Sequence, residues 1–149
     1  MPSITVNKKG LHEYQVLEKF EAGIVLSGPE VKSVKGGQIN LKGSHVTVDH
    51  KNEVWLLNAH ISPYKFASRT QIGYDPTQSR KLLLTKKEVD YLRGKSKEQG
   101  LTIMPISVYT KGSLIKIEIG LVKGKKQRDK REDIKKRDLE RQLRNKIRR

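Results

Sequence analysis

Residues 101–122 read LTIMPISVYTKGSLIKIEIGLV, and this stretch decides the fold. Apolar and β-branched residues fill two runs, 101–109 and 113–122, and the pair Lys111 and Gly112 between them is typical of a turn. Strands this close in sequence favour antiparallel pairing. We therefore expect two neighbouring antiparallel strands at this end of the folded body.

The pattern continues outward from this stretch into the rest of the body. Short apolar runs bounded by Gly, Pro, Asn and Asp predict further strands at 13–26, 44–50 and 53–61. Residues 49–52 are expected to form the hairpin turn between the last two. Residues 62–80 are rich in Ser, Thr, Gln and Pro, which predicts a long loop, and long ordered loops are often functional.

Two helices are expected to interrupt the strands. Ser27 and Glu30 have the spacing of a capping box, and Gly36 is expected to end the helix that follows. Thr85 and Glu88 repeat this signal at the start of a longer helix. Five strands with two helices predict a mainly β fold, an OB-like antiparallel β-barrel with two or three helices.

The charge of the chain points to a polyanionic partner, because 32 Lys and Arg against 16 Asp and Glu give a formal net charge of +16. Nucleic acid is the first candidate and a membrane surface the second. No apolar run approaches the roughly 20 residues of a membrane span. The first residues also lack the apolar core of a signal peptide. Cysteine is absent, which excludes disulfides and cysteine nucleophiles and suits a reducing compartment. We expect a cytoplasmic protein with no membrane partner.

The composition changes abruptly toward the C-terminal end. Residues 123–149 contain 14 Lys and Arg against 5 Asp and Glu, so we predict a folded domain at 1–122 and a basic tail at 123–149. Large apolar residues are too few in this tail to offset the entropy cost of ordering it, which predicts disorder in the free protein. Leu139, Leu143 and Ile147 lie four apart, however, so its latent structure is a basic helix.

The tail carries closely spaced cations, as phosphate contact requires. An RNA-binding arm is favoured over a solubilising tail. A membrane helix is disfavoured because the apolar stripe has three members and no aromatic residue. Asp129 lies among these cations, where it either accepts hydrogen bonds from RNA bases and hydroxyls or favours a helix start through the helix dipole.

Three residues of the first predicted helix are candidates for RNA contact. Lys32 and Lys35 lie three apart, on one helix face, where they could hold a phosphate backbone. Glu30 could accept hydrogen bonds from RNA, but it is also the acid of the capping box, and local rules favour the cap.

Histidines in the body do not indicate an enzyme or a metal site. Strand alternation places His45 and Asp49 on one side and His50 on the other, while His60 lies on a different strand. No metal-binding, phosphate-loop or nuclease motif accompanies them, so we predict no catalysis, metal or cofactor. Trp55 lies in an apolar run and is expected to pack. With few aromatic residues available, shape recognition of structured RNA is favoured over stacking on single-stranded bases.

Several short blocks in one order carry a resemblance to a known family. They are NKK at 7–9, HEY at 12–14, FEAGI at 20–24, GPEVKS at 28–33, Asn58 with Ile61, PY at 63–64, DP at 75–76, RKLLL at 80–84, GKK at 124–126 and DKR at 129–131. With these blocks, the chain resembles the SsrA-binding protein family, also called SmpB or small protein B, from about Asn7 onward.

This resemblance implies a non-enzymatic RNA-binding factor of trans-translation. Family members bind the tRNA-like domain of transfer-messenger RNA, also called SsrA RNA, and take the place of its missing anticodon arm. On a stalled ribosome their tail becomes helical in the vacant mRNA channel, next to the rRNA of the decoding centre. The nascent peptide is then tagged and the ribosome is rescued. The implied partners include an elongation factor that carries the charged RNA, and the implied oligomeric state is a monomer.

The resemblance and the charge pattern together assign candidate site residues. Those expected to bind the tRNA-like domain are Asn7, Lys8, Lys9, His12, Glu30, Lys32, Lys35 and Asn40. Those expected to bind the ribosome are Lys125, Lys126, Arg128, Asp129, Lys130, Arg131, Lys135, Lys136 and Arg137. Two other functions compatible with such a chain are a ribosomal or general tRNA-binding OB protein and a small nuclease.

Overall fold

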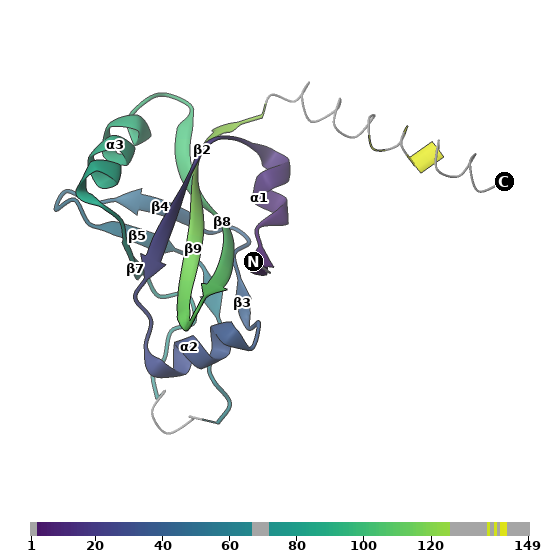
Figure 1. Cartoon of the computed structure of the whole chain (residues 1–149), viewed down its shortest axis with the longest axis vertical. Coiled ribbons are helices and arrows are strands. Elements are labelled where there is room, and N and C mark those ends of the chain that lie inside the picture. Colours follow the sequence, from purple (N-terminus) through teal and green to yellow (C-terminus); the bar gives the residue numbers. More distant parts are fainter. Residues whose placement is uncertain (1–2, 67–71, 126–136, 138, 140, 143–149) are drawn as a thin grey trace.

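The computed structural model describes residues 3–66, 72–125, 137, 139, 141 and 142 of the chain (Figure 1). Its elements are β1 (Ser3–Val6), α1 (Lys8–Glu13), β2 (Tyr14–Ile24), α2 (Gly28–Lys35), β3 (Ile39–Asn40), β4 (His45–Val48), β5 (Val54–Leu57), β6 (His60–Ile61), β7 (Arg80–Leu83), α3 (Lys86–Ser96), β8 (Leu101–Lys111) and β9 (Leu114–Gly124). All strand pairings are antiparallel. The predicted fold class, a mainly β barrel with helices, is confirmed.

Six strands close into a barrel. The main sheet has the order β1-β8-β4-β5-β7-β2-β9, and β9 pairs back onto β8. One edge of the long strand β8 pairs with β9, and the other is shared between β4, which pairs at Ile103, and β1, which pairs from Ser107 to Tyr109. The hairpin predicted first, β8 and β9, therefore joins the two ends of the sheet. Closure gives each barrel strand a neighbour on both sides, although β2 meets β7 only at Gly23 and Ile24.

Apolar side chains from every side of the barrel meet in one core. Leu56, Ile117 and Ile119 are fully buried there, as strand alternation requires. Helices α2 and α3 lie at opposite ends of the barrel (Figure 1). Val34 of α2 and Leu92 of α3 are fully buried in the same core. Both ends are thereby covered by helices.

A second apolar cluster lies beneath α1. Met104, Ile106 and Val122 are buried there, with side chains that include Leu11 packed against them. Gly10 allows this close packing, because a Cβ atom on it would lie 2.8 Å from Met104 Sδ. The short helix α1 is thus pressed against the outside of the barrel.

Several expected boundaries differ from the observed ones. The strand predicted at 53–61 is divided into β5 and β6, since Asn58 has a φ of 62° and breaks the extended run. The strands β1, β3 and β7 and the helix α1 were not expected, and the predicted loop ends where β7 begins at Arg80. The hairpin turn at 49–52 is confirmed by a 2.9 Å hydrogen bond from Asp49 N to Glu53 O.

No helix within the described residues is both long and apolar enough to span a membrane. Likewise, no group of three or more His, Cys, Asp and Glu side chains in the described part of the chain could hold a metal ion.

Candidate nucleic-acid interface

Helix α2 begins with the capping box expected from the sequence. The Ser27 side chain accepts a hydrogen bond from Glu30 N at 3.4 Å, and Glu30 Oε1 accepts one from Ser27 N at 3.0 Å. Glu30 is only 3% exposed. Its second carboxylate oxygen, Oε2, faces inward, toward Arg80 on β7. The cap is therefore the observed role of Glu30, and its buried carboxylate is turned away from solvent.

Arg80 is the centre of a buried polar network. Its Nε donates to Glu30 Oε2 at 2.8 Å, and its Nη1 donates to the carbonyl oxygen of Ala59 at 2.6 Å. Its Nη2 donates to the Tyr74 hydroxyl and to Pro76 O at 3.0 and 2.9 Å. The Tyr74 hydroxyl in turn donates to Glu30 Oε2 at 3.0 Å. This network ties α2, β7 and the segment at 74–76 together.

The same network shifts the acidity of its members. Burial raises the pKa of Glu30, but hydrogen bonds from the Ser27 backbone and the Arg80 guanidinium outweigh it, so the pKa lies below its ordinary value of 4.5. Burial, followed by the hydrogen bond to Glu30, raises the pKa of Tyr74 to about 12. Near neutral pH the network therefore holds an ionised carboxylate and a neutral phenol.

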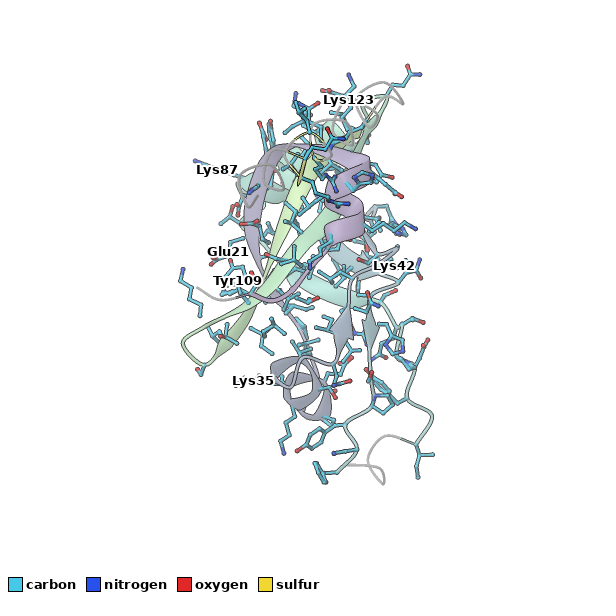
Figure 2. The ribbon with its side chains drawn as sticks, turned by 90° about the vertical axis from the view of Figure 1, so that its right-hand side faces the viewer. Glu21, Lys35, Lys42, Lys87, Tyr109 and Lys123 are labelled. Atoms are coloured by element: carbon cyan, nitrogen blue, oxygen red, sulfur yellow. The ribbon has the colours of Figure 1, made fainter. Side chains whose placement is uncertain are left out.

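The outer side of α2 carries the two predicted lysines. Lys32 and Lys35 are both exposed, and Figure 2 shows Lys35 on this helix, pointing away from the barrel. Lys32 Nζ lies 5.5 Å from the centroid of the Tyr64 ring. Asn40 on β3 is exposed, and its Oδ1 accepts a hydrogen bond from Lys42 N at 2.9 Å. Cationic side chains thus lie on the solvent side of a helix whose acid is buried.

The remaining candidates of the body lie on α1. Asn7 caps this helix, since its Oδ1 accepts from Gly10 N at 3.1 Å while its Nδ2 donates to Pro105 O at 2.9 Å. It is 5% exposed, so its amide serves the fold. Lys8 and Lys9 are exposed on the helix. His12 is half-buried.

The structure does not bring all the predicted residues together. The α1 group, which is Asn7, Lys8, Lys9 and His12, lies on a different part of the barrel from the α2 group, which is Glu30, Lys32, Lys35 and Asn40 (Figures 1 and 2). A ligand that contacted both groups would have to extend across the barrel.

The structure describes the start of the predicted tail and a few later positions. Strand β9 continues past the expected boundary, with Lys123 opposite Gln15 and Gly124 opposite Tyr14. Lys125 N then donates to Glu13 O at 3.0 Å. The expected ribosome-binding residues Lys126, Arg128, Asp129, Lys130, Arg131, Lys135 and Lys136 lie outside the described residues.

Arg137 is the other described residue of the predicted ribosome-binding set. Its backbone is helical, as it is at Leu139, Arg141 and Gln142. Arg137 Nη2 lies 2.9 Å from His12 Nδ1 on α1. One cation of the tail thus meets a residue expected to bind the tRNA-like domain.

Trp55 occupies a structural position, whereas the strand histidines lie on the surface. The Trp55 indole donates to Asp49 Oδ2 at 2.9 Å, so its polar edge is engaged within the hairpin. Hydrogen bonds, first from the Glu53 backbone amide and also from Trp55, hold the pKa of Asp49 below its ordinary value. His45 and His60 are exposed on separate strands.

Sequence reasoning missed the residues that hold the interface in shape. Arg80, Tyr74 and Gln78 all contact Glu30, yet they lie 44 to 50 positions away in sequence. One signal was present, since Arg80 opens the RKLLL block that contributed to the family resemblance. Arg80 lies two positions before Leu82 and so shares its strand face, which carries the arginine charge into the core, where it needs a partner.

Comparison with known proteins gives one consistent family. Residues 4–149 match the family model described as SmpB protein. An SsrA-binding protein from Sulfurihydrogenibium sp. is 51% identical over 140 residues, which cover 94% of this chain and 90% of the relative. Another from Oleidesulfovibrio alaskensis is 49% identical over 144 residues, with coverage of 97% and 91%.

A solved structure agrees in fold and in sequence. Described as "tmRNA-SmpB: a journey to the center of the bacterial ribosome", it matches with a TM-score of 0.68 and 39% identity over 83% of this chain and 85% of its own. With a family match that spans both the barrel and the tail, the chain belongs to the SmpB protein family.

Proposed function

We propose that this protein is the RNA-binding factor of trans-translation. It binds the tRNA-like domain of transfer-messenger RNA, or SsrA RNA, and delivers this RNA to stalled ribosomes. Its basic tail probes the empty mRNA channel next to the rRNA of the decoding centre. The nascent peptide is then tagged and the ribosome is released for further use.

One observation carries this proposal: the family match over residues 4–149 covers both the barrel and the basic tail. A barrel alone is compatible with many RNA-binding functions, because one fold hosts many sites. The tail is what a ribosome-probing factor needs in addition. At a rise of 1.5 Å per residue, about 20 helical residues of the tail would reach roughly 30 Å along a channel.

The proposed mechanism is binding and positioning, without a covalent step. Exposed lysines on α1 and α2, such as Lys9 and Lys35, contact phosphates of a folded RNA. The buried pair of Glu30 and Arg80 keeps α2 and the neighbouring loop in the shape that this RNA meets. We propose that the protein acts in the cytoplasm as a monomer, without catalysis or a cofactor, together with an elongation factor that carries the charged RNA.

The decisive experiment is to purify this protein from its native cells by an added affinity tag and to sequence the RNA that copurifies. We expect transfer-messenger RNA as the dominant species, bound far more tightly than tRNA at equal salt. Equal affinity for tRNA and transfer-messenger RNA would contradict the proposal and favour a general tRNA-binding protein. Cleavage of either RNA by the purified protein would favour a nuclease instead.

A further inference from the structure

A groove lies between α2 and the segment that follows β6. It has a volume of about 410 Å³, and its lining includes Lys32, Gly36, Gln38, Tyr64 and Lys65. A second cavity of about 280 Å³, beside the small sheet of β3 and β6, shares Gln38 with it. The two cavities therefore adjoin. None of the described residues that line them is acidic.

Tyr64, Lys32 and Lys65 line the groove, and the Phe66 ring lies just outside this lining, next to Tyr64. The centroids of Tyr64 and Phe66 lie 5.4 Å apart, with the rings inclined at 67°. Lys32 Nζ lies 5.5 Å from the Tyr64 ring and Lys65 Nζ lies 4.9 Å from the Phe66 ring. Phe66 is 75% exposed, so most of its ring surface remains accessible to a ligand.

The backbone that presents these rings is held in place. Ser62 N donates to Gln38 O at 3.1 Å, and Ile61 N donates to Pro76 O at 3.0 Å. The Tyr74 hydroxyl, which belongs to the Arg80 network, also lies 3.0 Å from Ile61 O. The backbone just before Tyr64 is therefore ordered before any ligand binds, which lowers the entropy cost of binding.

We propose that this groove takes an unpaired nucleobase of the bound RNA. The base stacks on the exposed Phe66 ring beside Tyr64, while the neighbouring phosphates contact Lys32 and Lys65. This inference rests on the proposed function, because it names the part of the RNA that the α2 side of the barrel recognises. Aromatic faces accept any base, and flanking cations hold the backbone. An apolar peptide would gain little from the two cations, which is why RNA is the chosen occupant.

Affinity and its salt dependence test the proposal together. The full chain and its Phe66→Ala and Lys65→Ala variants are titrated with the tRNA-like domain of transfer-messenger RNA at several salt concentrations. Loss of a stacked base predicts that Phe66→Ala binds about 5- to 100-fold more weakly with an unchanged salt slope. Lys65→Ala should lower the slope by about one, since one phosphate contact is lost. The matched control is Leu114→Ala, which removes another exposed apolar side chain, 60% exposed, on β9.

A spectroscopic readout separates stacking from other causes. Unpaired bases of the RNA are replaced one at a time by 2-aminopurine, whose fluorescence is quenched on stacking. We expect one position to be quenched by the wild-type chain and not by Phe66→Ala. Thermal unfolding should be the same for both, because Phe66 is outside the core. Affinity of Phe66→Ala within twofold of wild type, or quenching that survives the substitution, would overturn the proposal.

A second RNA ligand tests the groove independently of the proposed function. Hexa-adenylate offers unpaired bases without the tRNA-like fold. If the wild-type chain does not bind the tRNA-like domain, the proposed function fails, and the groove is still tested by hexa-adenylate. Weaker binding of hexa-adenylate by Phe66→Ala supports the groove, whereas equal binding overturns it. Selective capture of an apolar peptide, lost in Phe66→Ala while RNA affinity is unchanged, would also overturn it.

Discussion

Arg80 and Glu30 form a buried ion pair, with Arg80 Nη2 2.7 Å from Glu30 Oε2 and the two side chains 2% and 3% exposed. The pair joins the first turn of α2 to the first residue of β7. The carboxylate that caps the helix is therefore also the anchor of the long segment between β6 and β7. The helix cap, the buried ion pair and the groove beside α2 are therefore structurally connected.

Removing one partner of this pair should destabilise the fold strongly. Arg80→Met leaves the Glu30 carboxylate buried without its cation, which typically costs about 3–5 kcal/mol. The free energy of unfolding in urea measures this. The double variant Glu30→Met with Arg80→Met should recover part of the loss, because neither charge remains buried. A loss below about 1 kcal/mol in Arg80→Met would show that the pair is not essential to stability.

The pair also predicts how stability depends on pH. The folded-state pKa of Glu30 is depressed, so its ionised form stabilises the fold above the ordinary value of 4.5. That contribution is lost as the pH falls through the lower, folded-state pKa. The stability difference between wild type and Glu30→Gln should therefore be constant near neutral pH and should shrink on acidification. Urea unfolding of both proteins between about pH 7 and pH 3 measures it, and a difference that grows toward low pH would contradict the prediction.

The sequence predicts those contacts of this arrangement whose two residues lie close together along the chain, and misses those whose residues lie far apart. Ser27 and Glu30 form the expected capping box because its hydrogen bonds join residues three apart. The partner of Glu30 at Arg80 was not predictable from local rules, since it depends on how β7 joins the barrel. Asn58 likewise adopts a positive φ, which asparagine tolerates better than most residues, but the apolar run around it favoured a single strand. Tertiary contacts decide such positions.

The candidate site shows the same division. Charge and spacing correctly placed Lys32 and Lys35 on one exposed helix face. Asn7 was selected from a family block, and its buried amide instead holds α1 against the barrel. Sequence counts of aromatic residues suggested few stacking platforms, yet Tyr64 and Phe66, two positions apart in sequence, hold their ring centroids 5.4 Å apart. Composition cannot show where rare residues meet.

The close contact between α1 and the barrel predicts that a larger residue at Gly10 destabilises the fold. A Cβ there would lie 2.6 Å from Asn7 Nδ2 and 2.8 Å from Met104 Sδ, so Gly10→Ala must displace the capping Asn7 side chain and the Met104 side chain. Such overpacking typically costs about 1–3 kcal/mol. The control is Gly94→Ala in α3, where the new Cβ would meet no heavy atom within 4 Å apart from the nearby backbone of its own helix. There alanine should stabilise by about 0.5–1 kcal/mol through helix propensity. Thermal melting distinguishes the two, and equal effects would contradict the packing argument.

The end of β9 predicts where the folded domain can be cut. Lys123 and Gly124 pair with β2, and Lys125 N donates to Glu13 O, so a chain ending after Lys125 keeps these contacts. A chain ending after Val122 loses them all. We expect the first truncation to melt like the full chain and the second to melt at a lower temperature. Identical melting of the two would show that the last residues of β9 add nothing to the fold.

The truncation after Lys125 then separates the two proposed tasks of the chain. Its barrel retains the α1 and α2 groups, so it should bind the tRNA-like domain, although more weakly and with a smaller salt slope because tail cations are lost. It should fail to support peptide tagging on stalled ribosomes in a reconstituted translation system, because nothing reaches the mRNA channel. Full-length protein in the same system is the control. Normal tagging by the truncated chain would contradict a probing role for the tail, and loss of all RNA binding would contradict a recognition role for the barrel.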